Sequence, residues 1–140
     1  MATKQVIVIR KDLKMRRGKE IAQGAHAAMA FLTRRFHYDR DLEPVNVDEK
    51  RPDGWAYSGV ISTEEMEWME ASFKKVTLQV DSERELMELA ASARKAGVEC
   101  HVITDSGATE FGGVPTKTCL ALGPDTDERI DPITGHLRLY

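Results

Sequence analysis

The chain has 140 residues, of which 41% are apolar and 31% charged, and its formal net charge is −3. This composition is typical of one globular domain, and it lacks the run of roughly 20 apolar residues that a membrane span needs. Two cysteines, Cys100 and Cys119, exclude a disulfide framework, and the N-terminus has no signal-peptide pattern. We therefore expect a cytoplasmic protein that does not bind membranes.

The first predicted strand is Gln5–Ile9, whose lack of polar alternation indicates burial on both faces. The basic segment Arg10–Lys19 follows it. Residues 1–40 hold ten Lys or Arg and three Asp or Glu, whereas residues 41–140 hold ten and twenty. Cations beside the free amides of a helix start suit phosphate. The segment predicts either a phosphate or RNA contact or a solvated basic turn, and charge alone leaves both open.

A helix is predicted over residues 19–36, because apolar residues recur there at three- and four-residue spacing. Its histidine, His26, is expected to be hydrogen-bonded in the core or close to a site. Residues 37–61 then lose periodicity and carry the turn signal at residues 52–54 and the aromatic side chains of Trp55 and Tyr57. A segment of this length is expected to be functional or poorly ordered.

The rest of the chain alternates helices and strands. A capping box at Ser62–Glu65 opens a short helix, whose carboxylates are expected on a solvated face: Glu64, Glu65, Glu67 and Glu70. The later predicted elements are a strand at 76–80, a helix from the capping box at Ser82 to Gly97, strands at 100–103 and 118–122, and a last helical turn that Asp125 caps and Pro132 stops.

This order of elements predicts an α/β fold over residues 1–140. Strands separated by helices become parallel through right-handed crossovers. No helix separates the strands at 100–103 and 118–122, so the last strand is expected to be antiparallel. The prediction is one three-layer domain with a mixed four-stranded sheet, three strands parallel and the fourth antiparallel, and helices on both faces.

In such sheets, ligands gather at the carboxyl ends of parallel strands. Lys19 follows the first strand and Asp105 follows the third, so neighbouring parallel strands would bring the two side chains together. An Asp beside a Lys at a helix start stays ionised and can orient water. The alternative is an ordinary Asp-Ser-Gly turn.

Other motifs are weaker. The pair Gly18-Lys19 lacks the earlier glycine and the following Ser or Thr of a phosphate loop, which argues against a nucleoside triphosphatase. Cys100 and His101 alternate across a strand and cannot chelate one metal ion. The sequence also contains no Gly-x-Ser-x-Gly motif. We therefore expect neither a metal nor a cofactor.

Four stretches in a fixed order resemble the type 2 peptidyl-tRNA hydrolases, the archaeal and eukaryotic kind. They are Val8–Met15 with Gly18-Lys19, Ala22-Gln23 and His26-Ala27; Asp105–Thr109; Thr118–Pro124; and Ile130–Leu139. The resemblance spans nearly the whole chain except residues 37–61, which look inserted. It implies the α/β fold, usually as a homodimer, and hydrolysis of the ester that joins a peptide to the 3′ ribose of tRNA, without metal or cofactor.

The resemblance also implies roles for individual residues. Four of them fall on the family's active-site lysine, aspartate and threonines: Lys19, Asp105, Thr109 and Thr118. The positions expected to bind the tRNA substrate lie on the basic segment, on the helix after it and before the last strand: Lys14, Arg16, Arg17, Gln23, His26, Thr116 and Lys117. Because the loop at residues 110–117 is about one residue longer than the family pattern, Thr116 and Thr118 could exchange roles.

Two departures from the family pattern stand out. Arg16-Arg17 replaces a glycine-containing pair, and Ala108 stands where an arginine is common. The alternatives to an enzyme are a tRNA- or RNA-binding relative without activity and a protein-interaction module that uses residues 37–61. Because the lysine, the aspartate and both threonines are intact, the sequence favours the enzyme.

Overall fold

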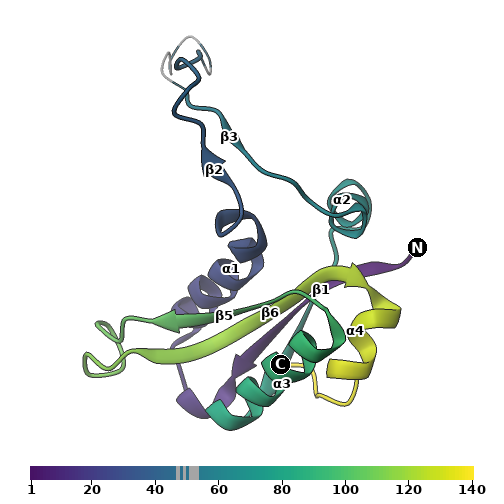
Figure 1. The fold of residues 1–140 in the computed structure, drawn as a ribbon. Helices are drawn as coiled ribbons and strands as arrows, with labels where there is room; N and C mark the ends of the chain where they lie inside the picture. The colour runs from purple at the N-terminus through teal and green to yellow at the C-terminus, as the bar shows by residue number, and fades with distance from the viewer. Residues whose placement is uncertain (47, 49, 51–53) are drawn as a thin grey trace.

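The molecule is built around a four-stranded sheet with helices on both faces (Figure 1). The structure is a computed structural model and describes every residue except 47, 49 and 51–53. Within the described part of the chain, no helix is both long enough and apolar enough to cross a bilayer. The elements are β1 (Thr3–Arg10), the 3-10 turn η1 (Lys11–Leu13), α1 (Arg17–Thr33), β2 (His37–Tyr38), β3 (Tyr57–Ser58), α2 (Thr63–Glu70), β4 (Lys75–Val80), α3 (Glu83–Ala96), β5 (Cys100–Asp105), β6 (Thr116–Thr126) and α4 (Asp127–Thr134).

The strand order across the sheet is β4-β1-β6-β5. Strands β1, β4 and β5 run in one direction and β6 runs in the other, as predicted. Only β1 and β4 form a parallel pair, however, because β6 lies between β1 and β5 and is antiparallel to both. The expectation that β1 and β5 are neighbours is therefore wrong. The short loop after β5 returns β6 alongside it, and the 11-residue β6 pairs with β1 on its other edge.

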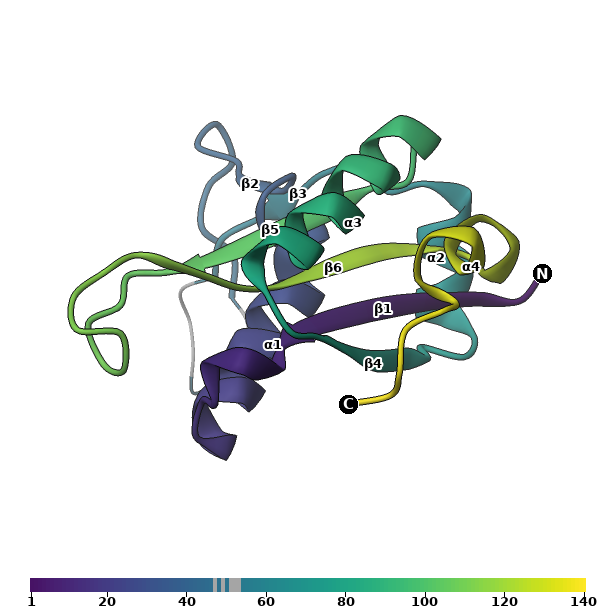
Figure 2. The ribbon, with the colours of Figure 1, turned by 90° about the horizontal axis from the view of Figure 1, so that it is seen from below.

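Side chains of β1 alternate between two apolar cores. Val6 and Val8 pack with α3 and α4 on one face, and Ile7 and Ile9 pack against α1 on the other. All four side chains are at most 7% exposed, which confirms the prediction of a strand covered on both faces. Figure 2 shows α3 and α4 in front of the sheet and α1 and α2 behind it. The sheet therefore holds the start of α1 close to the C-terminal end of β5 and the N-terminal end of β6.

The last helix differs from the prediction at both ends. Its N-cap is Thr126, whose hydroxyl accepts the Arg129 amide, whereas Asp125 is buried and ion-paired with Arg129. Pro132 lies inside the helix and does not stop it. A proline removes only one helical hydrogen bond, and the helix is held to the core by the fully buried Ile130 and by Ile133.

The described residues of the segment 37–61 form an arm that projects from the body (Figure 1). The two-residue strands β2 and β3 pair at its base, and Tyr38 packs edge-to-face on Trp55 with ring centroids 5.3 Å apart. Of the turn predicted at residues 52–54, the first two lie outside the described residues. The arm leaves from the C-terminal end of α1, while Lys19 lies at its start, about 20 Å away along the helix. It does not cover the start of α1 as a lid would.

The base of the arm is anchored by Arg35. Its guanidinium donates to the Val60 carbonyl at 3.1 Å and to Glu65 at 2.6 Å, and it also pairs with Glu99. Glu65 is only 4% exposed, so the expectation that all four carboxylates of α2 are solvated is wrong for this residue. A buried carboxylate needs a partner. That partner, Arg35, lies in the turn after α1 and leaves no local trace in the sequence around Glu65.

Candidate active site at the start of α1

Lys19 and Asp105 meet as expected, although their strands are not neighbours. Lys19 stands on the first turn of α1 and Asp105 is the last residue of β5. The Lys19 Nζ and Asp105 Oδ1 atoms are 2.7 Å apart, and the two side chains are 14% and 12% exposed. The other carboxylate oxygen, Oδ2, accepts the Gly107 amide at 2.8 Å. Asp105 therefore takes part both in the Asp-Ser-Gly turn and in the ion pair with Lys19.

The surroundings of Asp105 keep its carboxyl ionised. The Lys19 ammonium and the Gly107 amide hold the pKa of Asp105 below its usual value, and the Gln23 amide adds to this effect. Partial desolvation acts in the opposite direction but does not overcome these donors. The site therefore carries an ionised carboxylate in contact with the Lys19 side chain.

A buried polar chain lies beneath this ion pair. The Gln23 amide nitrogen donates to Asp105 Oδ1 at 3.3 Å, and the Thr118 hydroxyl donates to the Gln23 Oε1 at 2.5 Å. Gln23 is 2% exposed and Thr118 is fully buried. Because Thr118 occupies the amide oxygen, the amide nitrogen points toward Asp105. The structure therefore brings Thr118 to the site through Gln23, out of reach of solvent.

The loop between β5 and β6 supplies the remaining wall. Thr109 is exposed, and its Oγ1 accepts a hydrogen bond from Lys19 Nζ at 2.8 Å. The loop begins at Gly107, which has a φ of 83°, and a Cβ there would lie 2.0 Å from the Val114 carbonyl oxygen. Only glycine fits this turn. It places Thr109 over Lys19 and Phe111 against the apolar core below α1.

A second ion pair joins the same loop to the start of α1. Arg16, the N-cap residue of the helix, contacts Glu110 with 2.8 Å between Nε and Oε1. The backbone amide of Arg16 also donates to Glu110 at 3.4 Å. Glu110 is not among the site residues predicted from the sequence. In the sequence, Glu110 is marked only by its position next to Thr109. A carboxylate at that position does not indicate a site until its partner is known.

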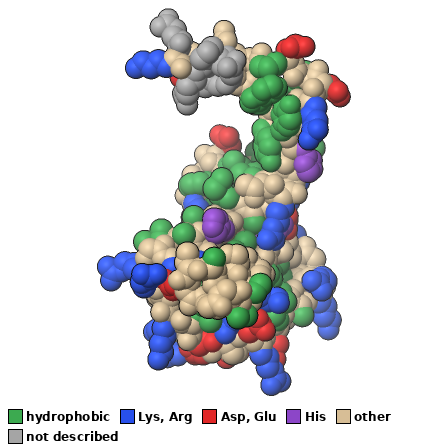
Figure 3. All heavy atoms as spheres, turned by 90° about the vertical axis from the view of Figure 1, so that its left-hand side faces the viewer, with side chains coloured by type: hydrophobic (Ala, Val, Ile, Leu, Met, Phe, Trp, Pro, Cys, Tyr) green, Lys and Arg blue, Asp and Glu red, His purple; other side chains and the backbone are tan. Residues whose placement is uncertain are grey.

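The other predicted binding residues surround this cluster at different depths. Lys14 and Arg17 are exposed beside the start of α1, while Thr116 and Lys117 are half-buried at the start of β6. The Thr116 hydroxyl donates to the Val114 carbonyl at 2.8 Å, so Thr116 is turned toward its own loop and Thr118 toward Gln23. Figure 3 views the molecule from the side of the loop between β5 and β6, and Lys and Arg side chains lie on several sides of this face.

His26 is exposed, so the expectation of a core histidine is wrong. The buried stripe of α1 runs through Gln23, Ala27 and Ala30, and His26 lies beside that stripe. It lines a shallow groove with Met29 and Arg34. The helical pattern identified the helix correctly, but it did not determine on which side of the buried stripe this residue falls.

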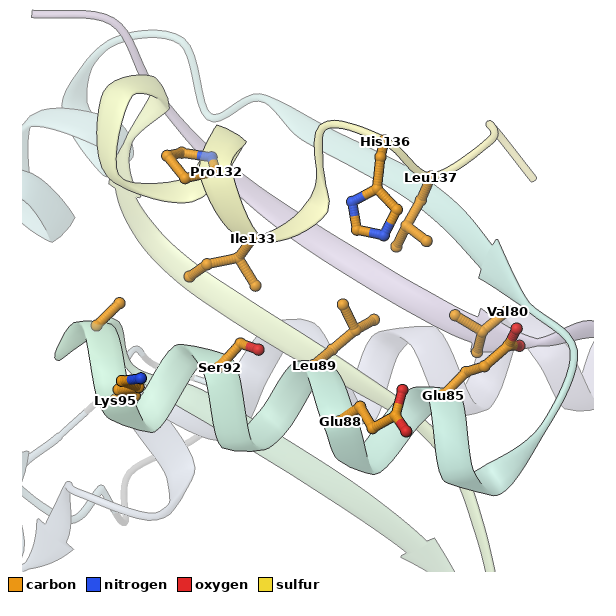
Figure 4. Close-up of a pocket in the computed structure, with 11 residues that line it drawn as sticks. Val80, Glu85, Glu88, Leu89, Ser92, Lys95, Pro132, Ile133, His136 and Leu137 are labelled. Atoms are coloured by element: carbon orange, nitrogen blue, oxygen red, sulfur yellow. The ribbon is translucent and has the colours of Figure 1, made fainter.

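A groove of about 710 Å³ lies elsewhere, between α3 and the segment after Pro132 (Figure 4). Its rim carboxylates already have local partners: Glu85 accepts the Asp81 amide at 2.6 Å, and Glu88 accepts from Arg84 at 3.0 Å. This groove lies on the α3 side of the sheet, opposite α1, so its size does not mark the reactive groups. Among the described residues, no three His, Cys, Asp or Glu side chains are grouped as metal ligands would be.

Comparison with known proteins gives a consistent result. The family model described as peptidyl-tRNA hydrolase PTH2 matches residues 3–140. Proteins named peptidyl-tRNA hydrolase are similar to this chain in Methanocaldococcus jannaschii (40% identical, covering 97% of this chain and 98% of the relative) and in Thermococcus onnurineus (38% identical, covering 97% and 96%). A solved structure of a protein of unknown function from Agrobacterium shares the fold, with a TM-score of 0.53 at 13% identity over 100% of this chain and 98% of the other.

Proposed function

The chain belongs to the PTH2 family of peptidyl-tRNA hydrolases, and we propose that it hydrolyses the ester between a peptide and the 3′ ribose of tRNA at the cluster around Lys19 and Asp105. One observation carries this assignment of the site. A lysine and an aspartate from distant parts of the chain form an ion pair at the start of a helix, with the Thr109 hydroxyl beside them. Ester hydrolysis needs an oriented water molecule and stabilisation of a developing oxyanion, and these groups can supply both.

Asp105 orients the attacking water in this mechanism. Its Oδ2 oxygen accepts one hydrogen bond, from Gly107, and retains a lone pair for a water molecule. Since Lys19 and Gly107 lower the pKa of Asp105, the carboxylate is a weak base. Its main contribution is to hold the water and to stabilise the positive charge that builds on it during attack.

Lys19 stabilises the negative charge that develops on the carbonyl oxygen. Its ammonium carries three protons, of which two are donated to Asp105 and Thr109, and the third is available for the substrate. Thr109 accepts from Lys19, which leaves its own O–H free to donate to substrate oxygen. As the ester C–O bond breaks, one proton of the water passes to the ribose oxygen and the other passes to solvent, so that the tRNA regains its ribose hydroxyl and the peptide is released as a carboxylate.

Gln23 and Thr118 act by positioning. The buried side chains of Thr118 and Gln23 fix the plane of the Asp105 carboxylate from beneath. This geometry favours a supporting role for Thr118 over direct contact with the scissile ester, and it supports Thr109 as the threonine that faces the substrate.

The tRNA backbone is bound, in this proposal, by the basic segment before α1. Lys14, Arg16 and Arg17 carry exposed side chains beside the reacting groups. The half-buried Thr116 and Lys117 and the exposed His26 would extend the contact along the same face. The remaining chain is acidic, so this segment is the natural source of phosphate affinity.

The two alternative functions are less favoured. A non-catalytic RNA-binding relative has no need of an ordered Lys19–Asp105–Thr109 cluster, yet the cluster is complete. A protein-interaction module would use the arm, whose Trp55 and Tyr57 are exposed. The arm lies at the opposite end of α1, so an interaction there is compatible with the enzyme but does not replace it.

We further propose a cytoplasmic homodimer. Both cysteines are free, which suits a reducing compartment. Membership of the family favours a dimer, and exposed apolar side chains on α1, such as Ile21 at 66% and Met29 at 56%, border a groove with Ile7 and Ile9 of β1. An apolar surface of this kind suits contact with a second copy.

Purified protein is expected to release labelled N-acetylated amino acid from tRNA, and EDTA is expected to leave the rate unchanged. The reason is that both Asp105 oxygens accept hydrogen bonds from protein donors, which suits the carboxylate to water rather than to a metal ion. The assay compares turnover with and without chelator at micromolar enzyme. Absence of turnover above buffer would contradict the proposed function, and loss with EDTA would contradict a metal-free mechanism.

The double variant Lys14→Gln/Arg17→Gln is expected to raise KM roughly tenfold and to leave kcat nearly unchanged. A phosphate contact far from the reacting ester is present in both the ground state and the transition state, so its loss weakens binding alone. A salt titration should also show the slope of log affinity against log salt flatter by up to about two units.

The matched control is Arg84→Gln/Lys95→Gln, which removes two exposed cations from α3 on the opposite face of the sheet. This control should leave KM and the salt slope unchanged. Equal slopes for both double variants and the parent would remove the basic segment from the binding surface and would favour the interpretation as a solvated turn.

A further inference from the structure

Three consecutive residues of the loop between β5 and β6 contact the first turn of α1 or the core beneath it. The Thr109 hydroxyl accepts from Lys19, Glu110 pairs with Arg16, and the Phe111 ring packs on the core with the Lys19 ammonium 5.8 Å from its centroid. The contact of Glu110 with Arg16 lies between the reacting groups and the basic segment. The mechanism above does not use it.

We propose that Glu110 is a positioning residue for catalysis, whose ion pair with Arg16 holds Thr109 against Lys19. This inference rests on the proposed function, because the consequence of the contact is read in the hydrolysis of peptidyl-tRNA. Arg16 has two roles in this arrangement: its Nε atom binds Glu110, and its side chain, which is 79% exposed, remains accessible to the tRNA backbone.

The contact differs from an ordinary surface ion pair. Glu110 is only 13% exposed and contacts both the side chain and the backbone amide of Arg16. Arg16 holds the pKa of Glu110 below its usual value, so the carboxylate remains charged at neutral pH. The pair Arg84–Glu88 on α3 has side chains 88% and 64% exposed, and pairs of that kind contribute little.

The loop needs such an anchor. Gly107, Gly112 and Gly113 all have positive φ, and glycine-rich segments have many accessible conformations. The loop also projects from the end of the sheet (Figures 1 and 2), so few other elements restrain it. Thr109 is exposed, and a small displacement of such a group lowers the rate because the reacting geometry is strict.

The first test is kinetic. Glu110→Gln keeps the size of the side chain but removes its charge, and it is expected to lower kcat about tenfold with KM within about twofold of the parent. Arg16→Gln should lower kcat by the same factor and also raise KM, because its phosphate contact is lost. The double variant should lose about tenfold in kcat rather than about 100-fold, because both substitutions break one contact.

The control cycle is Arg84→Gln, Glu88→Gln and their combination. These variants remove an Arg–Glu pair of the same chemical type far from the site, and kcat and KM should remain those of the parent. Melting temperatures of all variants establish that the fold is intact. A kcat for Glu110→Gln within twofold of the parent, or losses that multiply in the double variant, would overturn the proposal.

Amide hydrogen exchange provides a readout that does not depend on activity. Exchange in residues 106–115 should become faster in Glu110→Gln and Arg16→Gln and stay unchanged in the α3 control. Unchanged exchange in the loop would overturn the proposal that the Arg16–Glu110 pair holds this loop, even if the variant enzyme is active. If the parent protein hydrolyses no peptidyl-tRNA, the proposed function fails and the catalytic role of Glu110 fails with it, while faster exchange would still identify a structural clamp.

Discussion

Replacement of Asp105 by Asn is expected to lower kcat at least about 100-fold. Asn has the size of Asp but no negative charge, so it no longer balances the Lys19 ammonium 2.7 Å away or the positive charge on the attacking water. Its amide group must also direct an N–H toward either Lys19 or the Gly107 amide, both of which are donors. The measurement is kcat at saturating N-acetylaminoacyl-tRNA.

The control for this variant is Asp131→Asn. Asp131 also accepts from a lysine, Lys4, at 2.5 Å, but it lies on α4, away from the start of α1. Its kcat should match that of the parent. Asp105 stands at the end of a strand and is not part of either apolar core, so circular dichroism should be unchanged. Near-normal turnover of a folded Asp105→Asn protein would exclude Asp105 from the reacting groups.

Replacement of Lys19 by Ala is the second large effect, again at least about 100-fold in kcat. The substitution removes the ammonium that is proposed to face the oxyanion, and with it the hydrogen bond that Thr109 accepts from Lys19. Because Lys19 and Asp105 act as one unit, the double variant Lys19→Ala/Asp105→Asn should be little slower than either single variant. Lys4→Ala is the matched control, since it removes a lysine from an ion pair elsewhere. Losses that multiply would show that the two groups act independently.

The residual activity of Lys19→Ala should also have a changed pH profile. Lys19 favours the ionised form of Asp105 and so lowers its pKa. Without Lys19 the pKa of Asp105 rises toward its usual value, and the carboxylate is protonated at a higher pH as the solution is acidified. The acid limb of kcat against pH should therefore move to higher pH. A limb at the same pH as in the parent would mean that another group controls it.

The arrangement of the site explains why substitutions at different residues should affect either kcat or KM. Lys19, Asp105 and Thr109 touch the space in which the ester would lie, and their loss should lower kcat. Lys14 and Arg17 lie outside that space, and their loss should raise KM. Glu110 and Gln23 support the site from outside that space, since Glu110 pairs with Arg16 and Gln23 donates to Asp105. Kinetic constants, rather than activity at one concentration, are therefore the informative measurement.

The sequence alone determined the order of the four strands of the main sheet and of the helices around it, and the direction of those strands. Capping boxes at Ser62 and Ser82 marked two helix starts, and in the structure both hydroxyls accept the amide three residues on. The uninterrupted apolar run at Val6–Ile9 identified the central strand. Such signals are local, because a cap or a buried strand is encoded within a few neighbouring residues. The meeting of Lys19 with Asp105 was expected from neighbouring parallel strands, and it occurs although β6 separates the two strands.

Tertiary structure alone decided the order of the strands across the sheet and the pairing of side chains from distant parts of the chain. It inserted β6 between β1 and β5. The contact of Thr118 with Gln23 and the pairs Arg16–Glu110 and Arg35–Glu65 join residues that are 30 to 95 positions apart. No periodicity or spacing encodes such a pair, because each partner alone is compatible with solvent. The sheet brings the partners together, and only then do burial and charge select the contact.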